Sequence, residues 1–330
     1  MRIALAIVAC CFVSLSWAGE ALQVEDRRIA AIRKLCEKKA YAEAAPLARA
    51  LADELATPNA AGTPEALNRN HWAVAVWSGR ISQAQRQMPQ AETWFQRAVT
   101  SAEVVFGPEH ANTSGSVDEL ANFYQSQVRL VEAEPLYQRA IAIRIKAYGA
   151  THPKTAESLA GLARLYKSQG RYDVALPLYR RVFEIRQSAL GAEHPETLSS
   201  MTDLAEIWRA QRDYPEAEKL IRRVLSQRES TLGATHPDTV ASLAALAEIY
   251  RETRRIPDTE RLLKRILATR ESTLGATHWE TRASLNDLIR FYLDQGRETE
   301  AQPLIKRVQE AIRVESAKLK AAAPTTAPQK

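Results

Sequence analysis

Apolar side chains recur every three or four residues along most of this chain, the spacing that places them on one face of an α-helix. A representative stretch contains two such runs, separated by the polar segment Gln169-Gly170-Arg171. The first run is Leu159, Leu162, Ala163 and Tyr166, and the second is Ala175, Leu178, Tyr179 and Val182. The two runs predict an antiparallel helix hairpin in which the small Ala163 and Ala175 let the backbones approach. Because no segment alternates like a strand, the sequence predicts an all-α fold.

The hairpin pattern is repeated at a fixed period. A Gly-x-x-His connector recurs every 42 residues, and residues 228–236 are repeated letter for letter at 270–278, so the units are duplicated. The connectors begin at Gly107, Gly149, Gly191, Gly233 and Gly275. A glycine at this point suits the left-handed conformation in which many helices end. The prolines that follow three of the histidines suit the first turn of the next helix.

The period divides the chain into seven hairpins. One hairpin cannot bury all of its apolar surface, so neighbouring units are expected to stack and complete the core. The predicted organisation is a signal peptide at 1–18, a degenerate hairpin at 19–56, a loop at 57–64, a degenerate repeat at 65–106, five regular 42-residue units at 107–318 and a disordered tail at 319–330.

The first eighteen residues have the pattern of a secretory signal peptide. Met1-Arg2 gives a charged start, an apolar stretch follows, and Ala18 ends a small-x-small sequence after which cleavage is expected. The apolar stretch is short for a membrane span, which needs about 20 residues, so cleavage is favoured over retention as an anchor. The mature chain is then periplasmic or secreted, with no stable membrane insertion. It keeps only Cys36, for which burial among apolar residues is favoured over pairing between chains.

The spacing of small and large apolar residues in each unit resembles the signature of the tetratricopeptide repeat (TPR) family. The 42-residue period, the Leu-Gly-x-x-His-Pro connector and the second helix that begins at Tyr172 are similar to the kinesin-light-chain-like subgroup, here of a bacterial exported type. The resemblance implies a right-handed superhelical solenoid of antiparallel hairpins. It also implies a protein that binds other polypeptides and holds no cofactor.

In TPR proteins the first helices of successive hairpins line a concave groove, and the resemblance assigns ten residues of this chain to it. They are Asn122, Gln125, Arg164, Lys167, Glu206, Arg209, Glu248, Arg251, Asn286 and Arg290. A polar groove with a basic middle favours an extended segment or helix that carries carboxylates. The alternative is an ordinary solvated helix surface.

The kinesin-light-chain-like subgroup often has paired asparagines on the first helix, and this chain departs from that pattern. The second asparagine position holds Gly161, Asp203, Ala245 and Asp287. Asn286 keeps part of the pattern. The departure disfavours recognition of kinesin-type cargo peptides.

Other classes of function find little support. The 45 Lys+Arg and 39 Asp+Glu residues alternate along the chain instead of forming a basic stripe, which disfavours nucleic-acid binding. The sequence has no phosphate-binding loop, metal-binding His-Glu-x-x-His helix or nucleophile elbow, so it predicts no enzyme.

Five of the six histidines occupy equivalent connector positions, where stacked units place them about 10 Å apart. Neighbouring rings at that distance cannot share one zinc ion. We therefore expect these rings to form hydrogen bonds with the connector backbone, and the remaining His71 to be a packing or groove residue. No metal site is predicted.

The sequence thus predicts an exported adaptor or scaffold that binds a peptide or helix in its groove. The alternative, from a different class, is a membrane-tethered structural module of the cell envelope that keeps its apolar N-terminus and assembles by stacking repeats between chains. The sequence does not indicate the oligomeric state.

Overall fold

The computed structural model of the chain describes residues 27–56 and 64–322. In these residues it forms fourteen helices and no strand, which confirms the predicted all-α fold. They divide between two compact units, unit 1 at residues 1–191 and unit 2 at residues 192–330. The predicted signal peptide lies outside the described residues, as does the loop at 57–64 except for Pro64, where a helix begins. The last helix runs to Ala322, four residues into the predicted tail, and the rest of that tail is outside the described part.

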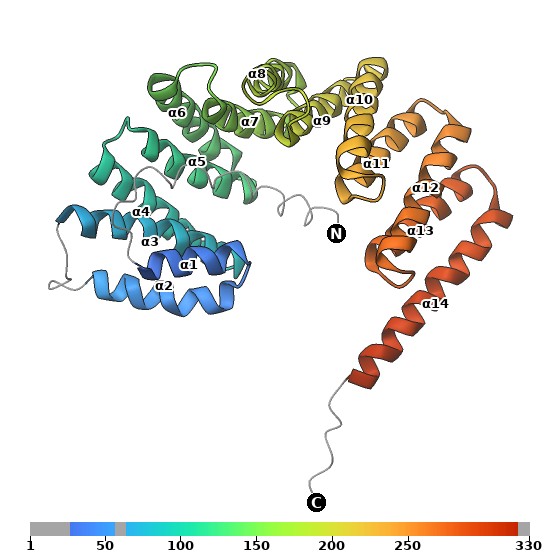
Figure 1. The fold of residues 1–330 in the computed structure, drawn as a ribbon, viewed down its shortest axis with the longest axis horizontal. Helices are drawn as coiled ribbons and strands as arrows, with labels where there is room; N and C mark the ends of the chain where they lie inside the picture. The colour runs from blue at the N-terminus through green and yellow to red at the C-terminus, as the bar shows by residue number, and fades with distance from the viewer. Residues whose placement is uncertain (1–26, 57–63, 323–330) are drawn as a thin grey trace, which may run out of the picture. The chain divides into compact units, whose positions relative to one another are not determined.

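Each unit is a series of helix hairpins that follow one another along the chain (Figure 1). Unit 1 contains α1 (Arg27–Glu37), α2 (Tyr41–Leu55), α3 (Pro64–Ala84), α4 (Met88–Phe106), α5 (Ala111–Ser126), α6 (Leu130–Tyr148), α7 (Pro153–Ser168) and α8 (Tyr172–Leu190). Unit 2 contains α9 (Pro195–Ala210), α10 (Tyr214–Leu232), α11 (Pro237–Glu252), α12 (Ile256–Leu274), α13 (Trp279–Asp294) and α14 (Glu298–Ala322). We call the odd-numbered helices first helices and the even-numbered ones second helices.

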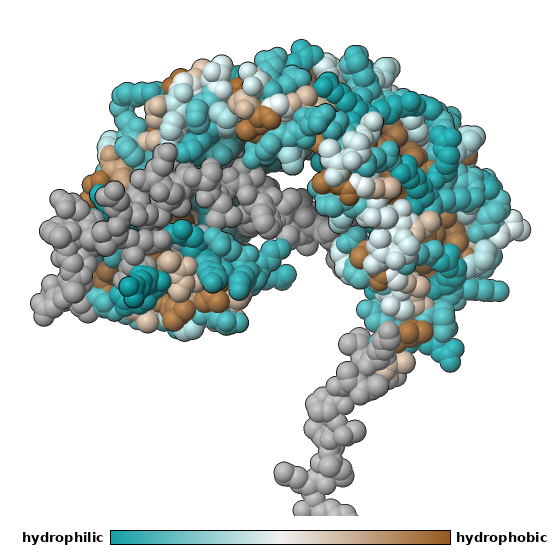
Figure 2. Space-filling model, in the orientation of Figure 1, coloured by the Kyte–Doolittle hydropathy of each residue, from teal (hydrophilic) through white to brown (hydrophobic). Residues whose placement is uncertain are grey.

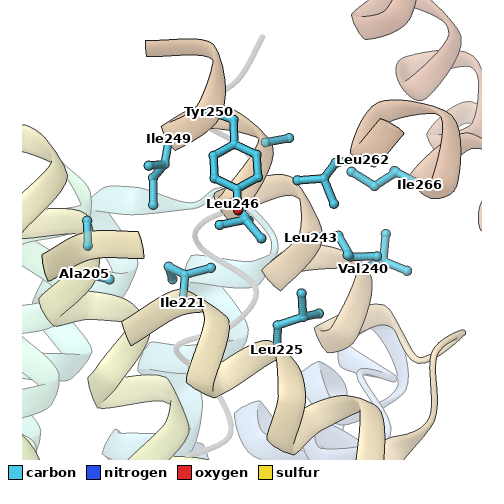
Figure 3. Close-up of a cluster of buried hydrophobic side chains, with 12 residues drawn as sticks. Ala205, Ile221, Leu225, Val240, Leu243, Leu246, Ile249, Tyr250, Leu262 and Ile266 are labelled. Carbon is cyan, nitrogen blue, oxygen red and sulfur yellow. The ribbon is translucent and has the colours of Figure 1, made fainter. Parts of the chain in front are cut away.

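The apolar positions predicted from the period form the core. Ala163 and Ala175, on facing helices of one hairpin, are both fully buried, and Tyr179 beside them is buried as well. In unit 2 a cluster of buried side chains joins two successive hairpins, with Ile221 of α10 lying among residues of α11 (Figure 3). A hairpin therefore completes its core with the next hairpin, as expected for stacked repeats.

Polar contacts also join successive hairpins, through a Glu–Tyr–Arg clamp. The hydroxyl of Tyr166 on α7 donates to Glu134 Oε1 on α6 at 2.8 Å, and the guanidinium of Arg171 lies 4.4 Å from the centre of the tyrosine ring. The same arrangement occurs at Glu92–Tyr124–Arg129, Glu218–Tyr250–Arg255 and Glu260–Tyr292–Arg297. Each clamp combines a charge-assisted hydrogen bond with a cation–π contact.

The connectors use glycine and histidine for separate purposes. Gly149 has φ +94° and ψ 163°, a region that only glycine adopts readily, so the positive φ was predicted correctly although ψ is extended rather than left-handed helical. The next histidine, His152, is the N-cap of α7, and its Nδ1 accepts the backbone N–H of Lys154 at 3.1 Å. All five connector histidines cap a first helix in this way. The rings therefore form backbone hydrogen bonds as predicted, but with the first turn of the following helix and not with the connector itself.

A half-buried arginine near the end of the second helix reaches into the next hairpin. In unit 2, Arg228 of α10 donates to the carbonyl oxygen of Asp238 at 3.1 Å and to Ser242 Oγ at 2.9 Å, both on α11. Arg270 of α12 makes the equivalent bond to Ser284 Oγ at 2.7 Å. These arginines recur at the 42-residue period, and their role is to join adjacent hairpins.

The visible surface is mainly hydrophilic, with small and scattered apolar areas (Figure 2). None of the described helices is both long and apolar enough to cross a membrane. Cys36 of α1 is buried in an apolar cluster, and desolvation raises the pKa of its thiol to about 11. The predicted burial of this cysteine is therefore confirmed.

Candidate peptide-binding face

First helices of neighbouring hairpins contact one another through polar side chains in both units. In unit 1, Arg80 of α3 forms an ion pair with Glu119 of α5, and Trp72 Nε1 donates to Ser116 Oγ at 2.8 Å. In unit 2, Arg209 of α9 reaches Glu252 of α11 at 2.6 Å. The predicted groove residues all lie on these helices. We call the polar side of the first helices in each unit the first-helix face.

In unit 1 the predicted residues Asn122 and Gln125 lie on α5, with Arg164 and Lys167 at the equivalent positions of α7. The structure brings the two amides together around one hydroxyl, because Tyr137 of α6 places its Oη 2.7 Å from both Asn122 Oδ1 and Gln125 Oε1. A hydroxyl has a single proton, so one of the two amides must instead donate through its nitrogen. One amide therefore accepts the hydroxyl proton of Tyr137 through its oxygen, and the other donates an N–H to the hydroxyl oxygen.

Gly161 explains how Tyr137 reaches this face. The tyrosine ring passes between α5 and α7, and a Cβ atom at position 161 would lie only 2.9 Å from Cδ1 of the ring. The glycine occupies the second asparagine position of the subgroup, so the departure noted in the sequence has a physical cause. The space that an asparagine would use is filled by the aromatic ring.

A buried charged cluster lies beneath the same part of unit 1. Arg144 of α6 forms ion pairs with Asp118 of α5 and Glu157 of α7, each at 2.9 Å, and Ser158 donates to Asp118 Oδ2 at 2.7 Å. The other carboxylate oxygen, Oδ1, is buried and has no hydrogen-bond partner among the described residues. Desolvation raises the pKa of Asp118 above its usual range, against the opposing effect of Arg144.

This cluster was not predicted, although the sequence contains a signal for part of it. Arginine recurs every 42 residues at 144, 186, 228 and 270 on an otherwise apolar helix face. Asp118 has no such signal, because the equivalent positions hold unrelated residues such as Ala160 and Ala244.

In unit 2 two of the three predicted basic residues form ion pairs. Arg209 pairs with Glu252, and Arg251 pairs with Glu248 on the same helix. Glu206 is half-buried, whereas Asn286 and Arg290 of α13 are exposed.

The described residues offer no site for a metal ion, since none of them form a group of three or more histidine, cysteine or acidic side chains with suitable geometry. The connector histidines use Nδ1 for capping. His71 lies exposed on α3, so it is not a packing residue.

Comparison with known proteins places the fold in a family. A family model described as tetratricopeptide repeat matches residues 114–188, 167–212 and 197–272, and a second model of that description matches 79–112. The nearly identical TPR-like repeats of a Podosopora anserina protein described as a kinesin light chain are 32% identical, with 62% of this chain and 96% of that chain covered and a TM-score of 0.56.

More distant solved structures share the fold alone. BtubC (BKLC) from P. vanneervenii is 18% identical, with coverage of 82% and 97% and a TM-score of 0.55. The apo form of the quorum sensor NprR from B. thuringiensis is 12% identical, with coverage of 89% and 91% and a TM-score of 0.57. No significant match was found among curated proteins. The chain belongs to the tetratricopeptide repeat family, and its repeats are of the kinesin-light-chain-like kind.

Proposed function

We propose that this protein is an exported adaptor that binds a polypeptide segment along the first-helix face. Membership of the TPR family supports the general part of this proposal, because stacked TPR hairpins form scaffolds with extended binding surfaces for other proteins. The observation that carries the specific part is the position of the Tyr137 hydroxyl between Asn122 and Gln125.

That hydroxyl orients two amide groups at a surface where Asn122 is exposed and Gln125 is half-buried. An amide side chain offers an NH2 group with two donors and a carbonyl oxygen that accepts, which together complement a peptide backbone in extended conformation. Holding the amides in place before binding lowers the entropy cost of binding. The face of α5 and α7 is thus suited to a peptide backbone.

The charges on α7 favour an acidic segment. Arg164 and Lys167 lie on the helix next to the two amides, and guanidinium and ammonium groups bind carboxylates through charge-assisted hydrogen bonds. Because these two cations lie beside the amides that the Tyr137 hydroxyl orients, we assign the acidic partner to the first-helix face of unit 1.

The proposed location is the periplasm or the extracellular medium, after cleavage of residues 1–18. Intact-mass measurement of the protein purified from its own cells tests this. A chain that begins at Gly19 supports export by a cleaved signal. A chain that keeps residues 1–18 and sediments with membranes would instead favour the tethered structural module.

Site-specific photo-cross-linking tests the binding face. A photoreactive amino acid at position 122 is expected to capture a partner in envelope extracts, whereas one at Lys219, an exposed residue of the second helix α10, should capture much less. Arg164→Glu combined with Lys167→Glu should lower the yield at position 122 at least fivefold. Equal yields from both positions, or a yield unchanged by the charge reversal, would refute the proposed face.

A further inference from the structure

Second helices of neighbouring hairpins are joined by ion pairs in which the two partners lie 36 residues apart. In the best-defined case, Arg139 Nη2 of α6 lies 2.6 Å from Glu103 Oε1 of α4. The described pairs of this kind are Arg139–Glu103 in unit 1, and Arg265–Glu229 and Arg307–Glu271 in unit 2. They form an outer ladder of arginine and glutamate on the second helices.

The ladder lacks its acidic partner between α6 and α8 of unit 1. Arg181 of α8 is equivalent to Arg139, but the position equivalent to Glu103 holds Ile145, which is 37% exposed. Arg181 donates instead to the backbone carbonyl of Ala150 at 3.3 Å, and it has no carboxylate partner among the described residues. One carbonyl uses only part of the donor capacity of a guanidinium group, which carries five N–H donors.

An open pocket of about 450 Å³ lies beside Arg181. Its walls include the side chains of Arg180, Arg181, Glu184 and Ser188 of α8 and Thr151 of the connector, with Ile185 buried beneath them. The lining carries two guanidinium groups and one carboxylate. Pro177 adds apolar surface to the lining.

We propose that this pocket binds an acidic side chain of a partner polypeptide, whose carboxylate takes the place of the glutamate missing from the ladder. The three complete pairs show that this position of a second helix favours an arginine–carboxylate contact. A guanidinium group can hold a carboxylate through two parallel N–H···O bonds, and the hydroxyls of Thr151 and Ser188 add further donors. Pro177 provides apolar surface for the residue next to the acid. This docking surface lies on the second helices and is separate from the first-helix face.

NMR titration with short peptides tests the proposal. One peptide carries a central Leu-Glu pair between glycine and serine residues, and its control carries Leu-Gln. At low ionic strength the Leu-Glu peptide should shift the Arg181 side-chain Nε–H signal and bind at least tenfold more tightly than the Leu-Gln peptide. Equal affinity for the two peptides would overturn the proposal.

Variants at the missing position provide matched controls. Ile145→Glu restores the intramolecular pair and should abolish binding of the Leu-Glu peptide, whereas Ile145→Gln fills similar space without charge and should keep affinity within about threefold. Glu103→Ile removes the partner of Arg139 and should create a second, weaker site, seen as a shift of the Arg139 signal. Retained binding in Ile145→Glu would overturn the proposal. Lys167→Glu, on the first-helix face, should leave this binding unchanged, so failure here is distinguishable from failure of the proposed function.

Discussion

Gly161 of α7 and Tyr137 of α6 pack so closely that a Cβ atom at position 161 would overlap the aromatic ring. The ring is almost fully buried, and its hydroxyl contacts two residues of the first-helix face. The absence of one side chain therefore controls the position of another, and through it the arrangement of Asn122 and Gln125.

Gly161→Ala is expected to lower the free energy of unfolding by about 1–2 kcal/mol. Alanine in a helix gains up to about 1 kcal/mol over glycine, but forcing a methyl group into a packed site costs about 1–3 kcal/mol, and here the ring has little space to move. Urea denaturation measures the difference. In a Tyr137→Leu background the overlap is gone, so the same Gly161→Ala change should stabilise. A stabilising effect in the original background would contradict the proposed overlap.

The hairpins and connectors could be predicted from the sequence because their causes are local and repeated. In the connector, glycine adopts a positive φ that other residues rarely adopt, and histidine is the N-cap of the next helix. Both features depend only on residues within a few positions of each other. Because the units are duplicated, the same connector occurs five times in the sequence. The overlap of Tyr137 with Gly161 could not be predicted, because it joins residues on different hairpins at a point where this unit differs from its neighbours.

Replacing Asp118 and replacing Arg144 should have very different costs. Arg144 is buried and also binds Ser114 Oγ and Glu157, so Arg144→Met leaves buried acceptors without a partner and is expected to cost about 3 kcal/mol. Asp118→Ala removes a carboxylate with one unsatisfied oxygen, and should change the free energy of unfolding by less than about 1 kcal/mol. Arg228 supports this expectation, since it bonds Ser242 where the position equivalent to Asp118 is Ala244.

The pH dependence of the Asp118→Ala effect provides an independent check. The pKa of Asp118 is raised in the folded protein, so its contribution to stability is present at acidic pH, below the pKa of the unfolded chain, and is lost as the pH rises. Asp118→Ala should therefore be more harmful at pH 4 than at pH 7. Denaturation curves at the two pH values measure this, and the opposite order would show that the ion pair with Arg144 outweighs burial.

The candidate binding face could be predicted only in outline. Family resemblance identified the helices and the positions, and the structure has all ten residues on first helices. The ion pairs of these charged residues could not be predicted. Arg209 and Glu252, for example, lie 43 residues apart in the sequence and meet only when hairpins stack. Periodicity indicates which residues share a face, but not which of them form ion pairs there.

His152→Asn should reduce the loss of stability on mild acidification. Burial and the nearby cations Lys154 and Arg144 lower the pKa of His152 in the folded protein. On acidification the histidine of the unfolded chain is therefore protonated first, near pH 6.5, and the ring of the folded protein is protonated only at a lower pH. The stability that the neutral ring provides is therefore present above that pH and is lost as the pH falls. Asparagine keeps an N-cap acceptor without titrating. Unfolding free energies between pH 7.5 and 5.5 should fall less steeply in the variant. His71→Asn, at an exposed histidine within α3, serves as the control for the histidine-to-asparagine replacement itself.

Glu260→Gln tests the Glu–Tyr–Arg clamps that join hairpins in unit 2. Hydrogen bonds from Arg297, then Lys264 and Tyr292, lower the pKa of Glu260 to about 2. The stability from this carboxylate is present above the pKa of the unfolded chain, near 4.3, and is lost as the pH falls toward 2. The variant should lose about 1–2 kcal/mol at pH 7, in the range for hydrogen bonds to charged groups, and the difference from the original protein should shrink below pH 4. Glu310→Gln, in the exposed pair with Arg313, should cost no more than a few tenths of a kcal/mol. If the two substitutions had equal and small effects at pH 7, the clamp would contribute no more than an ordinary surface ion pair. The cohesion between hairpins would then come from apolar packing and from the bonds of Arg228 and Arg270.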